Sequence, residues 1–236
     1  MPKGSLHLIP VPLSGGDISQ LSASGIKMAQ KIHHFFAENP KSARKFISLI
    51  HHPSKQAEIE VYPMDENSLT EDLQKLQAWI EQGLDIGIVS EAGLPCIADP
   101  GKKYVEWAHQ RAVKVIAYPG PNSMMMALMA SGLNGQEFQF HGYLPRKKEE
   151  LRNKLHLLIK ICSNHKASQI FMETPYRNKA LMEVLLKDLP PNFLLSVSIN
   201  LGTEKQFSIT QTILQWRKKD IEFIHDSPAI FIISNS

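Results

Sequence analysis

Short apolar runs alternate with segments of helical periodicity along the chain, and this alternation is typical of α/β proteins. In the first half, apolar runs at 5–11, 58–62, 85–89 and 114–118 predict strands, and periodic segments at 19–30, 39–50 and 104–111 predict helices. The run 32–36 is compatible with either a short strand or the end of a helix. Together with this run, the strand candidates before residue 119 are enough for one doubly wound domain.

Helix start and stop signals support two of the predicted helices. Asn39 followed by Pro40 is a typical N-terminal cap with proline in the first turn, and it predicts a helix that runs to about Ile50. Ser68 and Glu71 have the spacing of a capping box, which predicts the start of another helix, and Gly83 predicts its end.

The alternation resumes after the segment Y-P-G-P-N-S at 118–123, which we interpret as the boundary between two domains, 1–118 and 119–236. Beyond it, helices are expected at 123–130, 148–161 and 177–186, strands at 138–141 and 169–172, and three strand-like runs around a helix near 213–218. The first helix carries Met124, Met125, Met126 and Met129, which we expect to be core residues that pack against the other domain.

The composition is that of a soluble globular protein, with 43% hydrophobic and 21% charged residues. The sequence lacks the run of about eighteen apolar residues that a membrane span requires, and its N-terminal stretch lacks a signal-peptide pattern. Cys96 and Cys162 cannot build a disulfide framework, so a reducing cytoplasm is expected. The histidine pairs at 33–34 and 51–52 are adjacent residues whose side chains point in different directions, so we expect no metal site.

Three loops that follow predicted strands have the composition of ligand-binding loops, namely 10–17 (P-V-P-L-S-G-G-D), 90–101 (S-E-A-G-L-P-C-I-A-D-P-G) and 119–123 (P-G-P-N-S). Ligands of open α/β sheets bind at the carboxyl ends of strands, and small residues let a backbone approach them closely. The chain has neither a G-x-x-x-x-G-K-[ST] phosphate loop nor a G-x-G-x-x-G dinucleotide turn. Acidic loops suit a ligand with hydroxyl groups or a positive centre, and S-adenosylmethionine (SAM) is such a ligand.

The net charge is only +3, and a basic segment at 145–154, P-R-K-K-E-E-L-R-N-K, contributes much of the excess. Such a run is commonly the solvated start of a helix. It would also suit a phosphate backbone near a substrate site. The charge alone does not decide between these interpretations.

The stretch V-S-E-A-G-L-P-C-I-A-D-P-G at 89–101 resembles the V-S-D-A-G-x-P-x-I-S-D-P-G signature of the tetrapyrrole-methylase family, in its branch of ribosomal RNA ribose 2′-O-methyltransferases. Further matches follow in the same order: P-G-P-N-S at 119–123, A-S-G-L at 130–133, F-x-F-x-G-Y-L-P-R-K at 138–147 and F-M-E-T-P-Y-R at 171–177. Because the matches are collinear, the resemblance covers nearly the whole chain.

Three segments, 13–17, 37–43 and 198–205, depart from the family pattern. The first loop reads P-V-P-L-S-G-G-D-I where the family has P-T-P-I-G-N-L-x-D-I, and A-E-N-P-K-S-A replaces A-E-D-T-R-x-T. Late in the chain, S-I-N-L-G-T-E-K stands in place of A-R-E-L-T-K. The matching loops resemble the cofactor side of the family, whereas the altered segments lie where an acceptor would be chosen.

What the resemblance implies is two α/β domains with a SAM cleft between them, usually in a homodimer. The implied activity is SAM-dependent methyl transfer to RNA, most often ribosomal RNA, with no metal and no membrane. The N-terminal domain would carry the acceptor and SAM loops, and the C-terminal domain would complete the cleft. Cofactor contacts are expected at Pro10, Ser90, Glu91, Ala92, Gly93, Ile97, Ser123, Leu133, Met172 and Ala229.

A ribose hydroxyl is a poor nucleophile, so a positioned base would assist its methylation. Glu91, Glu38 and Glu173 are candidate bases, and Arg177 is a candidate clamp for a phosphate or carboxylate, although each could instead be a helix cap or part of a surface ion pair. Two other functions stay open. One is a methyltransferase for a small molecule such as a tetrapyrrole, a branch whose first loop, G-x-G-x-G-D, is not matched by 10–17. The other is a SAM-binding protein without catalysis.

Overall fold

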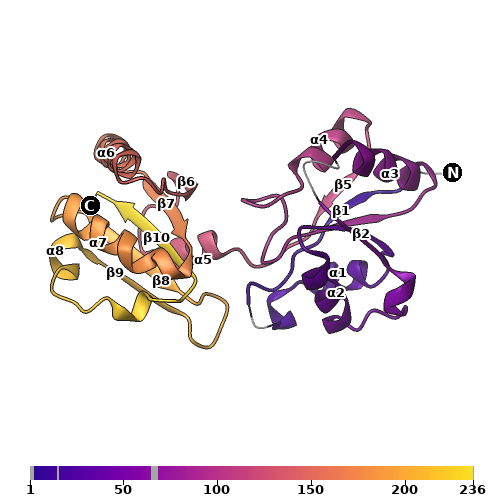
Figure 1. Ribbon diagram of the computed structural model, residues 1–236, viewed down its shortest axis with the longest axis horizontal. Helices are drawn as coiled ribbons and strands as arrows, with labels where there is room; N and C mark the ends of the chain where they lie inside the picture. Colours follow the sequence, from indigo (N-terminus) through magenta and orange to yellow (C-terminus); the bar gives the residue numbers. More distant parts are fainter. Residues whose placement is uncertain (1–2, 15, 65–68, 236) are drawn as a thin grey trace. The chain divides into compact units, whose positions relative to one another are not determined.

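The structure is a computed structural model that describes residues 3–14, 16–64 and 69–235 (Figure 1). The chain divides into two compact units, Met1–Asn122 and Ser123–Ser236. The division falls inside the segment 118–123, between the last strand of one unit and the first helix of the next. Each unit holds one five-stranded sheet with helices packed on it, so the predicted α/β class is confirmed.

The first unit contains a parallel sheet in the order β3-β2-β4-β1-β5. The ambiguous run at 32–36 forms a strand because Phe35 and Phe36 point to opposite faces of the sheet and fill a separate core on each. The strands of this unit are β1 (Leu6–Leu8), β2 (His34–Ala37), β3 (Glu60–Pro63), β4 (Ile86–Val89) and β5 (Val115–Ala117).

Helices cover both faces of this sheet, as in doubly wound folds. Helices α1 and α2 contribute to the core on one face, and α3 and α4 contribute to the core on the other. The helical elements of the unit are η1 (Ile18–Gln20), α1 (Ala23–Ala29), α2 (Pro40–Leu49), η2 (Gln56–Glu58), α3 (Leu69–Glu81) and α4 (Lys102–Gln110).

Local capping decides where these helices begin and end. As predicted, α2 starts at Pro40, and the Asn39 side chain accepts hydrogen bonds from the backbone nitrogens of Lys41 and Ser42. The single helix predicted at 19–30 is wrong, because the Ser22 side chain caps a new helix by accepting from the nitrogen of Gly25. The predicted capping box at Ser68 lies outside the described residues.

The second unit has a mixed sheet in the order β6-β7-β10-β8-β9. Only the pair β6–β7 is parallel among its described pairings. Helices α6, α7 and α8 pack on one face and α5 packs on the other (Figure 1). The elements are α5 (Ser123–Ser131), β6 (Phe138–Tyr143), α6 (Lys148–His165), β7 (Ser168–Glu173), η3 (Pro175–Arg177), α7 (Asn178–Asp188), β8 (Leu194–Ile199), β9 (Phe207–Thr212), α8 (Ile213–Trp216), η4 (Glu222–Ile224) and β10 (Ala229–Ser234).

The methionines of α5 do not behave alike. Met124 is buried against its own sheet, next to Ile230 of β10, and Met125 and Met126 are partly buried in the same cluster. Met129 is 84% exposed, so the prediction that all four methionines are core residues is wrong for this one. The buried methionines pack within their own unit because α5 lies against β8, β9 and β10.

Candidate functional site

Three loops of the first unit meet at the carboxyl end of the sheet. Strand β1 lies between β4 and β5, so the loops 10–17, 90–101 and 119–123 leave neighbouring parallel strands. The Val11 nitrogen donates to the Gly93 oxygen at 2.9 Å, and the Gly93 nitrogen donates to the Val11 oxygen at 3.1 Å. This two-way bridge joins the first two loops, as their predicted positions indicated.

The third loop packs against the first at Gly120. A Cβ atom at Gly120 would lie 2.2 Å from the Cβ of Pro10, a distance at which atoms cannot coexist. At Gly93, a Cβ atom would lie 3.1 Å from the Pro121 oxygen and from a methyl group of Leu13. The loops therefore approach one another through residues without side chains, and backbone groups make up much of this edge.

The loop 90–101 has an uncommon backbone conformation. Gly93 and Gly101 have positive φ angles of +74° and +122°, and Cys96 and Ala98 adopt left-handed conformations with φ of +68° and +64°. Non-glycine residues rarely have positive φ, and such strain persists only where the surroundings hold it. Clustering of strained positions in one loop is a feature of functional sites.

Two predicted catalytic carboxylates are brought together beside this loop. Glu38 follows β2, and its Oε2 atom accepts a hydrogen bond from the Glu91 backbone nitrogen at 2.9 Å. The Ser42 hydroxyl donates to Glu91 Oε1 at 3.0 Å. Asp99, at the far end of the loop, is partly buried, and burial together with the nearby charges of Glu38 and Glu91 raises its pKa to about 6, against a hydrogen bond from Ser90 that lowers it.

The electrostatics of this edge favour a cationic or hydroxyl-bearing ligand. Burial is the main cause of the raised pKa of Asp99 and disfavours charge in general, but the neighbouring charges of Glu38 and Glu91, which also raise it, would attract a cation. Cys96 lies in the same loop, and burial, together with the charge of Asp99, raises the pKa of its thiol to about 11. The thiol therefore stays protonated near neutral pH and is a poor nucleophile.

The predicted cofactor contacts of the first unit all lie in loops that meet. Ser90 is buried, and its hydroxyl donates to the Ala92 oxygen at 3.4 Å. Pro10 packs against Gly120, Gly93 forms the bridge, and Glu91 and Ile97 are exposed. The structure thus brings together Pro10, Ser90, Glu91, Ala92 and Gly93, and it leaves the Ile97 side chain open to solvent.

The predicted contacts of the second unit lie on its sheet and on α5. Ser123 is the first residue of α5, and Leu133 and Met172 pack in the cluster beneath this helix. Ala229 starts β10, and its side chain belongs to the core on the opposite face. Within the second unit, Leu133 and Met172 therefore share a face, whereas the Ala229 side chain does not.

Glu173 and Arg177 form an ion pair. Glu173 is buried, its Oε2 atom lies 3.1 Å from Arg177 Nη2, and its Oε1 atom accepts from the Thr174 nitrogen at 2.8 Å. The sequence left open a surface ion pair for each residue; the two do form an ion pair, but Glu173 is buried. Their catalytic roles stay predictions.

Sequence reasoning missed a chain of polar side chains, centred on the buried His7, that supports the third loop. His7, in the middle of β1, has its Nδ1 atom 3.0 Å from the Tyr118 hydroxyl and its Nε2 atom 3.3 Å from Asp85 Oδ1. Burial lowers the pKa of His7, more than the nearby Asp85 raises it. Tyr118 immediately precedes Pro119, so the chain anchors the start of that loop. The signal in the sequence that could have predicted this chain was a histidine, His7, inside an apolar strand.

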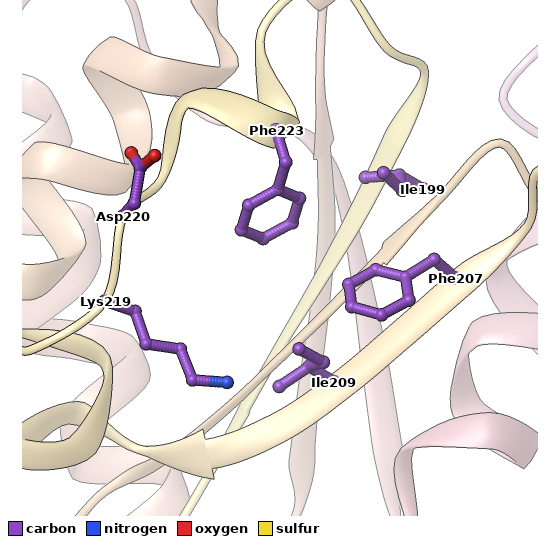
Figure 2. A pocket seen from close by; sticks show the side chains of 6 residues that line it. All are labelled: Ile199, Phe207, Ile209, Lys219, Asp220 and Phe223. Atoms are coloured by element: carbon purple, nitrogen blue, oxygen red, sulfur yellow. The ribbon is translucent and has the colours of Figure 1, made fainter.

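A cavity of about 470 Å³ in the second unit has a different character (Figure 2). The side chains of Phe207, Phe223 and Ile209 point into a common space, and Lys219 and Asp220 lie at its border. None of the predicted site residues lines it, and most of its lining side chains are apolar. We therefore do not assign the candidate site to this cavity.

The basic segment lies at the start of α6. Lys147 pairs with Glu150 at 3.2 Å, and Arg152 pairs with Asp188 at 3.2 Å. Arg146 and Lys148 are exposed and form no ion pair with another described residue. In the part of the chain that the structure describes, no helix is long and apolar enough to cross a membrane.

An open parallel sheet whose loops meet at the carboxyl ends of neighbouring strands defines a ligand-binding α/β protein. The chain belongs to the tetrapyrrole (corrin/porphyrin) methylase family, whose model matches residues 5–215. The resemblance predicted from the sequence motifs is thereby confirmed.

Among its relatives are two proteins named ribosomal RNA small subunit methyltransferase I. The one from Halalkalibacterium halodurans is 33% identical over 184 residues, which is 78% of this chain and 60% of the relative. The one from Bacillus subtilis is 29% identical over 186 residues, which is 79% of this chain and 60% of the relative. The chain thus spans about 60% of the length of these relatives.

Solved structures share the fold at low sequence identity. The methyltransferase CobJ superposes with a TM-score of 0.64 at 14% identity, covering 99% of this chain and 95% of that one. The uroporphyrin-III-C-methyltransferase from Thermus thermophilus superposes with a TM-score of 0.56 at 16% identity, covering 98% and 92%. At these identities the likeness concerns the fold alone.

Proposed function

We propose that the protein is a SAM-dependent methyltransferase that acts on RNA, with a ribose 2′-oxygen of ribosomal RNA as the acceptor. Family membership supports methyl transfer, and the names of the relatives support the RNA acceptor. The observation that carries the proposal is the backbone bridge between Val11 and Gly93, which joins the family signature at 89–101 to the first loop. A cytoplasmic location and a homodimer, expected from cysteine usage and from the resemblance, belong to the same proposal.

The residues of the first unit fit SAM. Its ribose hydroxyls and amino group need hydrogen-bond acceptors, and its sulfonium needs negative charge nearby. Glu91 is exposed at the start of the loop, and the negative charges of Glu38 and Glu91 near Asp99 would attract a positive charge there. The close approach at Gly93 and Gly120 holds the three loops together at the edge where SAM would bind.

When bound, SAM would supply an electrophilic methyl group. The protein's task is to align the acceptor oxygen with that group, and alignment alone can lower a barrier by about 7–11 kcal/mol. Glu91 is positioned for a role in proton removal, since Glu38 fixes its backbone and Ser42 fixes one carboxylate oxygen. The predicted SAM contacts Ser123, Leu133, Met172 and Ala229 belong to the same proposal.

Two measurements on the full chain test this proposal. Calorimetry should show binding of SAM and of its demethylated product in the micromolar range, and no comparable heat for NADH or GTP. Incubation with methyl-labelled SAM and total RNA should then place the label in RNA. Binding without transfer to RNA would favour a ligand-binding role, and transfer to a tetrapyrrole instead of RNA would favour the small-molecule activity.

A further inference from the structure

Two segments that depart from the family pattern line the same cavity. A cavity of about 360 Å³ in the first unit lies between the first loop, α2 and the start of the loop 90–101. The altered segment 13–17 contributes Leu13, Ser14 and Gly16 to its wall, and the altered segment 37–43 contributes Ser42. Glu91 of the signature completes this wall, so the departures surround a predicted catalytic carboxylate.

The walls of this cavity are divided by chemistry. Leu13, Phe46 and Leu49 supply an apolar side, whereas Glu91 and Ser42, which are hydrogen-bonded to each other, supply a polar side. Lys45 is exposed and adds an ammonium group at the wall. The volume falls in the range of small-ligand sites, which begins at roughly 300 Å³.

Ser14 provides a second and independent indication of a ligand. Its hydroxyl oxygen is buried and has no hydrogen-bond partner among the described residues. Buried polar groups are almost always paired, so an orphan hydroxyl in a cavity wall requires an explanation. A rotation of the Ser14 side chain toward the cavity would let a ligand hydroxyl satisfy it.

We propose that this cavity receives the acceptor nucleotide of a single-stranded RNA segment, an inference that rests on the proposed function. The base would lie against Leu13, Phe46 and Leu49, and the ribose hydroxyls would meet Ser14, Ser42 and Glu91. Lys45 would bind a neighbouring phosphate. Sequence-specific RNA recognition commonly uses unstacked bases that are enclosed by protein, which matches a cavity of this size. Glu91 would repel a ligand that carries several carboxylates.

Lys45 and Lys41 offer a matched test on one helix. Both are exposed residues of α2, but only Lys45 lines the cavity. With unmodified small-subunit ribosomal RNA as the probe, Lys45→Ala should raise the KM for RNA about tenfold, the value of one charge-assisted hydrogen bond. In Lys45→Ala, the slope of RNA affinity against salt concentration, both on logarithmic scales, should flatten by about 0.7, the value for one single-strand phosphate contact. Lys41→Ala should change neither quantity, and Lys45→Arg should restore most of the affinity.

Ser14→Ala separates ligand binding from folding. Because the hydroxyl has no partner within the protein, its removal should leave the Tm unchanged or raise it, while the KM for RNA rises severalfold. A lowered Tm with an unchanged KM would show a structural role only and would contradict the proposal. The affinity for SAM, measured by calorimetry, should be the same in the parent and in all four variants.

The outcomes also separate the cavity from the proposed function. Suppose that the parent methylates RNA but that Lys45→Ala and Lys41→Ala have the same KM for RNA and the same salt slope. That result would overturn the assignment of the cavity and leave the proposed function standing. Absence of SAM binding and transfer in the parent would overturn the proposed function. In that case, the affinities of Lys45→Ala and Lys41→Ala for a fluorescent ribosomal RNA fragment still test the cavity. Equal affinities would overturn the proposal that the cavity binds RNA.

Discussion

The backbone nitrogen of Glu91 donates a hydrogen bond to the side chain of Glu38 at 2.9 Å, across 53 residues of sequence. This bond ties the altered segment 37–43 to the family signature, and the Ser42–Glu91 bond ties them a second time. The altered segment 37–43 is therefore in direct contact with the loop that carries the resemblance. Changes in this segment should alter the position of Glu91.

Replacement of Glu38 by Gln should lower the pKa of Asp99. The amide still accepts a hydrogen bond from Glu91, but it removes one of the negative charges that raise this pKa. Burial remains, so the pKa should fall below about 6 without reaching its usual value. NMR titration of the Asp99 carboxyl carbon measures this, with Glu58→Gln in the same unit as control. If the pKa of Asp99 is unchanged in Glu38→Gln, the charge of Glu38 does not contribute to raising it.

The raised pKa of Asp99 also predicts a pH dependence of stability. Because the folded-state pKa lies above the usual 3.8, the folded state binds more protons than the unfolded state between pH 4 and 6. The Asp99 contribution to stability is therefore most favourable below pH 4 and is lost as pH rises through about 6.

Asp99→Asn should remove this loss. The difference in free energy of unfolding between variant and parent should shift in favour of the variant by roughly 1–2 kcal/mol as the pH rises from about 4 to about 7. This figure allows for solvent screening of the partly exposed group. Urea denaturation at the two pH values measures the gain. If the difference in free energy of unfolding between parent and variant does not change with pH, the raised pKa of Asp99 is not the cause of the pH dependence.

Gly120→Ala should destabilise the first unit by about 1–3 kcal/mol, the usual cost of overpacking. The new Cβ atom would meet the rigid ring of Pro10 at 2.2 Å, and the two loops would have to separate. SAM affinity should fall as well. The control is Gly135→Ala, because a Cβ atom there has no neighbour within 4 Å. Equal stability of the two variants in urea denaturation would show that the loop contact is unimportant.

Lys148→Ala should reduce the salt dependence of RNA binding by about 0.7 in slope, if the basic segment faces the substrate. Lys148 is exposed at the start of α6 and forms no ion pair with another described residue, whereas Arg152 is held by Asp188. SAM affinity should not change. Lys160→Ala, an exposed lysine later in the same helix, is the matched control. If the salt slopes of RNA affinity are equal in the two variants, the basic segment is only the solvated start of a helix and does not contact RNA.

Much of the fold follows from local signals in the sequence. Asn39 and Pro40 specify the start of α2 through the cap, and Gly132, at a φ of +68°, follows the last residue of α5. The failures have physical causes as well. The run 32–36 could be assigned only through its pairing with β3 and β4, and the break in 19–30 depends on a cap at Ser22.

The candidate site was predictable as a set of loops but not as a set of contacts. Small residues after strands indicated where the backbone would be open, and parallel strand order then brought the loops together. The bond between Glu38 and Glu91 depends on β2 and β4 being neighbours, which no local pattern encodes. The Ser14 hydroxyl and the cavity around it arise from the packing of the first loop on α2, which is a tertiary property.

The central claim is methyl transfer from SAM to a ribose oxygen of RNA. Its most direct test is incubation of the purified chain with methyl-labelled SAM and unmodified small-subunit ribosomal RNA, followed by digestion to nucleosides and separation. The account predicts label in a single 2′-O-methylated nucleoside, with loss of the signal when Glu91 is replaced by Ala. RNA that stays unlabelled while SAM is bound, or label that appears on a base, would contradict it.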